Sequence, residues 1–326
     1  MPYATARDGT QLYYEETGTG TPLIFVHEFS GDYRSWETQV RFFSRRYRCI
    51  TFNARGYPPS DVPKSRAKYS YRIAVGDIAD VLRHLGIKKT HVVGCSMGAY
   101  SSLQFGIHYP AMALSVTSVG AGAGSNPETR VAFLRGTEAN ARLFETLGMP
   151  AAVRERGVAA GRIPQMLKDP RGFAEFRRYH ESHSAIGLAH VQRGVQAKRP
   201  PLYQLESAFR NYRPPLFVIS GDEDDNCIGP AVFIKKASAN ARLWICPSAG
   251  HTVNTEEPGL FNLNLLDFLT LVDTGRWKPR DLRSVAKAKA GKNSAQRVTA
   301  SNATDQAALS LPRVAATNPG ASEART

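Results

Sequence analysis

The sequence predicts an α/β fold, in which a mostly parallel sheet carries helices on both faces and a helical segment interrupts the chain. Three observations support this prediction. Short, continuous apolar runs alternate with helical periodicity, the alternation stops between about residues 125 and 213, and it then resumes. The apolar fraction of 42% is sufficient for a hydrophobic core. No apolar run approaches the length of about 18 residues that a transmembrane helix requires.

The first third of the chain reads as a hairpin followed by alternating strands and helices. A turn at Asp8-Gly9 joins two short strand-like segments, 3–6 and 11–15. Continuous apolar runs, typical of strands buried on both faces, occupy residues 22–27, 48–53, 91–95 and 113–119. Helices are predicted between these strands at 36–43, 71–85 and 97–109, and Pro110 ends the last of them.

The middle of the chain lacks buried strands. Helical stretches follow one another there at 128–147, 173–183, 186–197 and 202–212. The α/β pattern then resumes with strands at 216–220 and 241–246 and helices at 230–239 and 257–271. We therefore divide the chain into a core formed by residues 1–124 and 214–275, a helical cap over 125–213, and a basic tail over 276–326. We expect residues 281–326 to be disordered, because they contain few large apolar side chains.

The formal net charge of +14 is confined to two segments. Residues 276–326 hold 10 Lys and Arg against 3 Asp and Glu, residues 126–213 hold 15 against 8, and the remainder is neutral. This distribution does not favour nucleic acid as a partner, because the tail offers no aromatic residue beyond Trp277 to stack on bases. The charge alone leaves the oligomeric state open.

The four cysteines lack CxxC spacing, so we expect neither a zinc ribbon nor a redox pair. The first ten residues contain no apolar stretch of the kind found in secretory signals. We therefore expect a cytoplasmic protein with free thiols, without a metal ion, a cofactor or a membrane span.

The motif Gly94-Cys95-Ser96-Met97-Gly98 lies between a predicted buried strand and a predicted helix. In this context G-x-S-x-G forms a sharp turn that lifts the serine hydroxyl above the carboxyl edge of the sheet. The flanking glycines allow the strand and the helix to approach each other. The backbone N–H of Met97, at the start of the helix, then faces a developing oxyanion. We predict that Ser96 is a nucleophile.

A serine nucleophile needs a base and an acid that orients the base. His251 follows the last predicted strand, in a loop that returns to the carboxyl edge of the sheet, and we predict that it is the base. The acid is expected after strand 216–220, where residues 222–225 are all carboxylates. We choose Asp224, three residues after Gly221, and keep Asp222 and Asp225 as alternatives.

The loop after strand 22–27 reads His27-Glu28-Phe29-Ser30-Gly31. By position, the backbone N–H of Phe29 is the second oxyanion donor. We interpret His27 as a structural residue that holds the loop. Glu28 is expected to point away from the site, and the alternative is that it adds a carboxylate to the site.

These motifs, together with the segments ARGYPPSDVP and SAGHTVNTEEP, resemble the α/β-hydrolase superfamily over about residues 3–273. The similar group has a serine nucleophile and a helical cap. The resemblance implies a cofactor-free hydrolase that cleaves an ester or lactone of a small organic substrate through a Ser-His-Asp triad and an acyl-enzyme. The alternatives are a C–C bond hydrolase of ring-cleavage products and a small-molecule receptor that retains the triad.

The chain departs from the family pattern at two places. Glu28 stands where the family usually has glycine, and Pro58 stands at a glycine position of the family's R-G-x-G-x-S-D segment. Ser96 argues against haloalkane dehalogenases and epoxide hydrolases, which carry Asp in place of the serine of the G-x-S-x-G motif. We expect Arg55 and Asp61 to be structural.

The predicted cap is rich in arginine. A solvated positive surface accounts for most of these side chains, because arginine is rarely buried unless it is paired. One or two of them turned toward the site would clamp a carboxylate, and we therefore expect an anionic substrate. The arginines on which this expectation depends are Arg135, Arg142, Arg154, Arg156, Arg162, Arg177, Arg178 and Arg193.

Overall fold

The computed structural model describes residues 2–285, so most of the predicted disordered tail lies outside the described residues. Within them, eight strands form one sheet in the order β1-β2-β4-β3-β5-β6-β7-β8. The first two strands form the predicted hairpin, β2 is antiparallel to β4, and all other neighbours are parallel. The predicted mostly parallel sheet is thus confirmed. The strands are Tyr3–Thr5 (β1), Gln11–Thr17 (β2), Thr21–Val26 (β3), Tyr47–Phe52 (β4), Thr90–Cys95 (β5), Ala113–Val119 (β6), Leu216–Gly221 (β7) and Ala241–Cys246 (β8).

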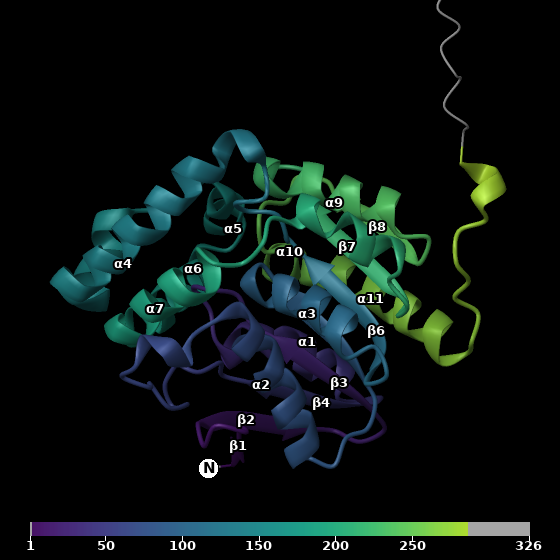
Figure 1. Ribbon diagram of the computed structural model, residues 1–326, viewed down its shortest axis with the longest axis horizontal. Helices are drawn as coiled ribbons and strands as arrows, with labels where there is room; N and C mark the ends of the chain where they lie inside the picture. Colours follow the sequence, from purple (N-terminus) through teal and green to yellow (C-terminus); the bar gives the residue numbers. More distant parts are fainter. Residues whose placement is uncertain (1, 286–326) are drawn as a thin grey trace, which may run out of the picture. The chain divides into compact units, whose positions relative to one another are not determined.

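Helices cover both faces of the sheet (Figure 1). Alternate residues of one strand serve the two faces: Ile24 packs with residues of α2, and Phe25 packs with residues of α1 and α11. Burial on both faces explains why the strands read as continuous apolar runs. The helices of the two faces are Glu37–Phe43 (α1) and Pro258–Asp273 (α11) on one side, and Tyr71–His84 (α2), Met97–His108 (α3) and Asp225–Ala237 (α9) on the other.

The topology brings the predicted site segments to one edge of the sheet. Strands β5, β6, β7 and β8 are parallel neighbours, so their carboxyl ends meet at the same edge. The turn at Ser96 follows β5, the acidic loop follows β7, and the loop that carries His251 follows β8. A short helix, α10 (Val253–Glu256), then leads into α11.

The segment between β6 and β7 is helical, as predicted, but its helices differ from the predicted ones. The predicted helix 128–147 ends at Leu147, because Gly148, with φ of 70° and ψ of 168°, is not helical, and a second helical stretch of α4 follows it as far as Arg156. Helix α5 was not predicted, and the predicted helix 202–212 is a 3-10 turn followed by the short helix α8. Figure 1 shows α4, α6 and α7 grouped beside the sheet. The helices of this inserted segment are Pro127–Arg156 (α4), Ile163–Lys168 (α5), Pro170–Glu181 (α6), Ala185–Val191 (α7) and Glu206–Arg210 (α8).

Trp277, which we placed at the start of the tail, packs edge-on against Phe268 with ring centroids 4.7 Å apart. The folded part of the chain therefore includes this residue. None of the described helices is both long and apolar enough to span a membrane.

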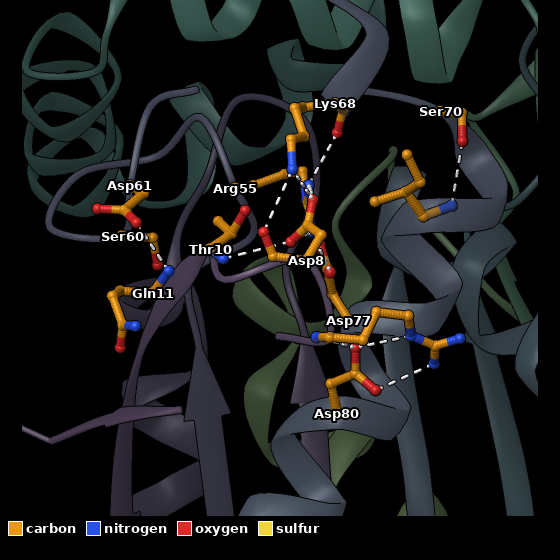
Figure 2. Close-up of polar contacts among 12 residues, drawn as sticks. Asp8, Thr10, Gln11, Arg55, Ser60, Asp61, Lys68, Ser70, Asp77 and Asp80 are labelled. Atoms are coloured by element: carbon orange, nitrogen blue, oxygen red, sulfur yellow. Dashed lines mark hydrogen bonds and ion pairs between the residues drawn. The ribbon is translucent and has the colours of Figure 1, made fainter. Parts of the chain in front are cut away.

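Arg55 anchors the loop after β4 to two other elements (Figure 2). Its buried guanidinium donates to both carboxylate oxygens of Asp77 in α2, at 2.7 and 2.8 Å, and to Asp8 in the β1–β2 turn, at 2.8 and 3.2 Å. Asp61 accepts a hydrogen bond from the backbone N–H of Gln11 at 2.8 Å. Both residues thus have the structural role that we expected.

We expect Asp77→Asn to lower the free energy of unfolding by about 3 kcal/mol. The substitution leaves the buried Arg55 guanidinium without one of its two carboxylate partners, and breaking a buried ion pair costs about that much. Urea unfolding followed by circular dichroism measures the change. The control is Asp61→Asn, which removes the charge from an exposed carboxylate and is expected to cost about 1 kcal/mol or less. Equal losses in the two variants would contradict the structural role that we assign to the Arg55–Asp77 pair.

Candidate active site

Ser96 occupies the turn between β5 and α3 in a strained backbone conformation. Its φ of 52° lies in the left-handed region, which residues other than glycine rarely adopt. A Cβ atom at Gly98 would lie 2.1 Å from the carbonyl oxygen of Val26, and one at Gly94 would lie 2.3 Å from the carbonyl oxygen of Gly98. Glycine is therefore required on both sides of the turn. The Ser96 N–H donates to the Val119 carbonyl oxygen at 2.8 Å, which fixes the turn to β6.

The structure brings Ser96, His251 and Asp224 into one hydrogen-bonded chain. The Ser96 hydroxyl donates to Nε2 of His251 at 2.7 Å, and Nδ1–H of His251 donates to Oδ2 of Asp224 at 2.6 Å. With Nδ1 protonated, Nε2 keeps its lone pair toward the serine. The three residues come from three loops at the same edge of the sheet.

The four neighbouring carboxylates after β7 differ in their surroundings. Asp224 is buried, whereas Asp222, Glu223 and Asp225 are exposed. One oxygen of Asp222 accepts a hydrogen bond from the Ala249 N–H at 3.1 Å and so holds the histidine loop. Among these four carboxylates, only Asp224 contacts His251. The geometry thus favours our choice over both alternatives.

The loop that carries His251 is braced by residues that the sequence analysis did not identify. The carboxylate of Glu256, which is buried, accepts hydrogen bonds from the N–H groups of Gly250 at 2.6 Å and Thr252 at 2.8 Å. The N–H of His251 donates to the carbonyl oxygen of Gly161 in the inserted segment at 2.8 Å. Glu256 therefore fixes the backbone on both sides of the imidazole. Its spacing from His251 carries no distinct sequence signal.

The charges at the site shift the pKa values of the imidazole and the carboxyl group. Burial alone would lower the pKa of His251, but the charge and hydrogen bond of Asp224, assisted by Glu28, raise it above its ordinary value. Burial alone would raise the pKa of Asp224, but the charge and hydrogen bond of His251 lower it. At neutral pH Asp224 is therefore an ionised acceptor that holds the Nδ1 proton of His251.

Hydrogen bonds of His27 and Tyr57 hold the loop after β3 in place. Nδ1–H of His27 donates to the Glu28 carbonyl oxygen at 2.6 Å, and Nε2 accepts from the Ala54 N–H at 3.1 Å. Burial lowers the pKa of His27 to about 4, so the ring is neutral and serves the structural role that we predicted. The Tyr57 hydroxyl donates to the Phe29 carbonyl oxygen at 2.8 Å.

The two predicted oxyanion donors lie beside each other in the same buried cluster. Phe29 and Met97 belong to one cluster of buried residues, and the close contact of Gly98 with Val26 brings the start of α3 against the end of β3. Neither the Phe29 N–H nor the Met97 N–H has a hydrogen-bond acceptor within residues 2–285. Both N–H groups are thus unpaired within the described part of the chain.

Glu28 does not point away from the site, contrary to our expectation. Its buried carboxylate lines the same cavity as Ser96 and forms an ion pair with Arg162 of the inserted segment. Nη1 of Arg162 also donates to Gln165 at 2.7 Å and to Thr252 at 3.1 Å. The partner that turns Glu28 inward thus comes from a distant part of the chain, and the local sequence gives no sign of it.

A cavity of about 330 Å³ lies over Ser96 and His251. The loops after β3, β6 and β7 form its floor, and the inserted segment supplies most of its walls. Three guanidinium groups and one buried imidazole come from those walls. Burial and nearby cationic groups hold the pKa of this imidazole well below its ordinary value, so it is neutral. These side chains are Arg156, Arg162, Arg177 and His180.

Possible metal-ligating atoms occur together at one place in the described residues. One atom each of Asp224, Cys227 and His251 lie within 4.8 Å of one another. The Cys227 thiol donates to the Gly120 carbonyl oxygen at 3.3 Å, and burial raises its pKa well above the ordinary value, so it is not a thiolate. Asp224 and His251 are engaged with each other. The donor set therefore does not fit a metal ion, and we assign none.

The chain resembles known proteins over most of its length. Residues 21–258 match the family described as alpha/beta hydrolase fold. A non-heme haloperoxidase of Rhodococcus erythropolis is 26% identical over 291 residues, which cover 82% of this chain and 99% of that protein. The enol-lactonase of Burkholderia xenovorans LB400 has a TM-score of 0.69 at 24% identity, covering 82% of this chain and 100% of that chain. A thermophilic esterase of Thermogutta terrifontis has a TM-score of 0.73 at 22% identity, covering 83% and 98%. The predicted fold and the predicted hydrolase class are thus confirmed, and the chain belongs to the alpha/beta hydrolase fold family.

Proposed function

We propose that the chain is a serine hydrolase that cleaves a carboxylic ester or lactone of a small organic substrate through an acyl-enzyme. The observation that carries this proposal is the hydrogen-bonded chain from Asp224 through His251 to Ser96 at the floor of a cavity. Nucleophile and base within hydrogen-bond distance, with the base oriented by a third group, is the arrangement that activates a serine hydroxyl.

The reaction proceeds in two halves. Oγ of Ser96 attacks the ester carbonyl carbon while Nε2 of His251 takes the hydroxyl proton, and the carbonyl electrons move onto the oxygen. The N–H groups of Phe29 and Met97 donate to this oxyanion, and one such donor is worth about 10²- to 10³-fold in kcat. The tetrahedral intermediate collapses, and the alkoxide leaves with the proton from His251. Water then repeats the sequence on the acyl-enzyme and releases the acid.

The inserted segment acts as a cap over this site in our proposal. It walls the cavity, and its Arg162 and Gly161 contact Glu28 and His251 of the core. The three cavity-facing guanidinium groups favour a substrate that carries a negative charge. Two of the eight cap arginines on which we based that expectation, Arg142 and Arg193, pair with Glu138 instead, and Arg193 also pairs with Glu145.

A burst experiment tests the proposed function. With excess 4-nitrophenyl acetate, wild-type chain is expected to release a rapid burst of nitrophenolate close to one equivalent when deacylation is the slow step. A fluorophosphonate probe is expected to add one label, on Ser96, as located by peptide mass spectrometry. A receptor that merely retains the triad would turn over no ester. A C–C hydrolase would bleach a coloured ring-fission product much faster than it cleaves esters. Absence of both turnover and labelling would overturn the proposal.

The pH profile of kcat/KM is expected to reach half its maximum above pH 6.5. The neutral form of His251 is the base, and its pKa lies above the ordinary value, so activity is lost as the pH falls through that raised pKa. Glu28→Gln removes one of the charges that raise this pKa, so the midpoint is expected to move to lower pH. Initial rates between about pH 5 and pH 9 measure both profiles. A melting curve of the variant is the control, because Arg162 loses its carboxylate partner. An unchanged midpoint in a folded Glu28→Gln variant would contradict the prediction.

A further inference from the structure

The three guanidinium groups that face the cavity are not equivalent. Arg162 is paired with Glu28, and Arg177 lies 3.8 Å from Glu181. The guanidinium group of Arg156 also lines the cavity, but it has neither a hydrogen bond nor an ion pair with any residue in the range 2–285. Partial burial lowers the pKa of its guanidinium group. An unpaired cation in a partly desolvated position is costly, and an anion beside it would remove that cost.

Aromatic contacts orient Arg156 and connect it to the loop of Phe29. Its guanidinium carbon lies 5.5 Å from the ring centroid of Phe144, and this ring stacks on Phe29 with centroids 6.2 Å apart. Arg156 is the last residue of α4, just before the segment 157–162, which ends in a 3-10 turn and forms one wall of the cavity. A group bound to Arg156 is therefore inside the cavity that holds Ser96.

The remaining charged and titratable groups around the cavity do not compete for this position. Glu28 is held by Arg162, and Asp224 is held by His251. His180 is neutral, because its pKa lies well below the ordinary value. The cationic excess of the cavity thus rests on Arg156 and, in part, on Arg177.

We propose that Arg156 binds a carboxylate of the substrate that is distinct from the ester being cleaved. The substrate is then a monoester, or a lactone, of a compound that keeps a second acidic group free. A guanidinium fork matches the two oxygens of a carboxylate and binds them with charge-assisted hydrogen bonds. Arg162, by contrast, has its carboxylate within the protein and serves to place Glu28. This inference rests on the proposed function, since it names the substrate class of the same site.

The test compares mono-4-nitrophenyl glutarate with its neutral methyl ester. Wild-type chain is expected to prefer the free acid in kcat/KM. Arg156→Ala is expected to reduce the ratio of acid to neutral ester by about ten- to a hundredfold, the range for charge-assisted hydrogen bonds. Arg156→Lys is expected to retain part of the preference, because it keeps the charge but not the fork. Glutarate itself is expected to inhibit the wild type competitively and to inhibit Arg156→Ala more weakly.

The matched control is Arg154→Ala, which removes the same charge from an exposed position on the same helix. Its ratio is expected to stay within about twofold of the wild type. The wild-type preference is also expected to persist at about 0.5 M salt, where steering between exposed charges is screened. An unchanged ratio in Arg156→Ala, or equal drops in Arg154→Ala and Arg156→Ala, would overturn the inference. Failure of the proposed function would give a different result from failure of this inference, because wild type and Ser96→Ala would then be equally inactive on both esters.

Discussion

Ser96→Ala is expected to lower kcat for ester hydrolysis by 10⁴-fold or more, on the order found for triad nucleophiles. The substitution removes the oxygen that forms the acyl-enzyme. It leaves Cβ in place, so the left-handed φ of 52° is no more strained than in the wild type. The backbone hydrogen bond to Val119 is also retained. We therefore expect the melting temperature to change by no more than a few degrees.

Steady-state rates with 4-nitrophenyl acetate, together with fluorophosphonate labelling, measure this loss. His251→Ala is the companion variant, since it removes the base but keeps the nucleophile. Because members of a triad act as a unit, the double variant is expected to lose little more than either single variant. Additive losses, or near-normal turnover by Ser96→Ala, would show that these two residues do not act together on the substrate.

The sequence predicted the parts of this site that lie next to buried strands. Ser96 follows β5 directly, and Asp224 and His251 lie three and five residues after the ends of β7 and β8; parallel strands deliver such positions to one edge of a sheet. Choosing the acid within the loop after β7 required the three-dimensional structure. Residues 222–225 are four successive carboxylates with the same chemistry, and only their burial and the direction of their side chains distinguish them.

The sequence did not predict what the inserted segment contributes. The direction of Glu28 depends on Arg162, which lies more than a hundred residues away in the chain. The same holds for Arg156, since neither periodicity nor charge separates a guanidinium in a cavity from one in water. The sequence analysis also did not predict the second helical stretch of α4, which follows the break at Gly148 and ends at Arg156. Packing between distant segments decides these features, and a single sequence does not record it.

Asp224→Asn is expected to lower kcat by about 10⁴-fold while the fold stays intact. The carboxylate accepts the Nδ1 proton of His251 at 2.6 Å, which leaves Nε2 free to accept the proton of Ser96. An amide in its place can donate to Nδ1 and thereby favours the tautomer with the proton on Nε2, which is unable to serve as the base. The loss is therefore expected in kcat more than in KM.

Asp222→Asn and Asp225→Asn are the matched controls for this prediction, because they make the same chemical change one or two residues away. Asp222 holds the Ala249 N–H from an exposed position, and Asp225 lies exposed in the first turn of α9. Asp222→Asn is expected to reduce kcat less than tenfold. Asp225→Asn is expected to change the free energy of unfolding by no more than about 1 kcal/mol, through the loss of a charge at the start of the helix. A large loss confined to Asp222→Asn or Asp225→Asn would move the acid to that residue. A similar small loss in all three variants would mean that His251 is oriented by its backbone contacts with Gly161 and by the bracing of Glu256, and that no carboxylate of this loop is needed.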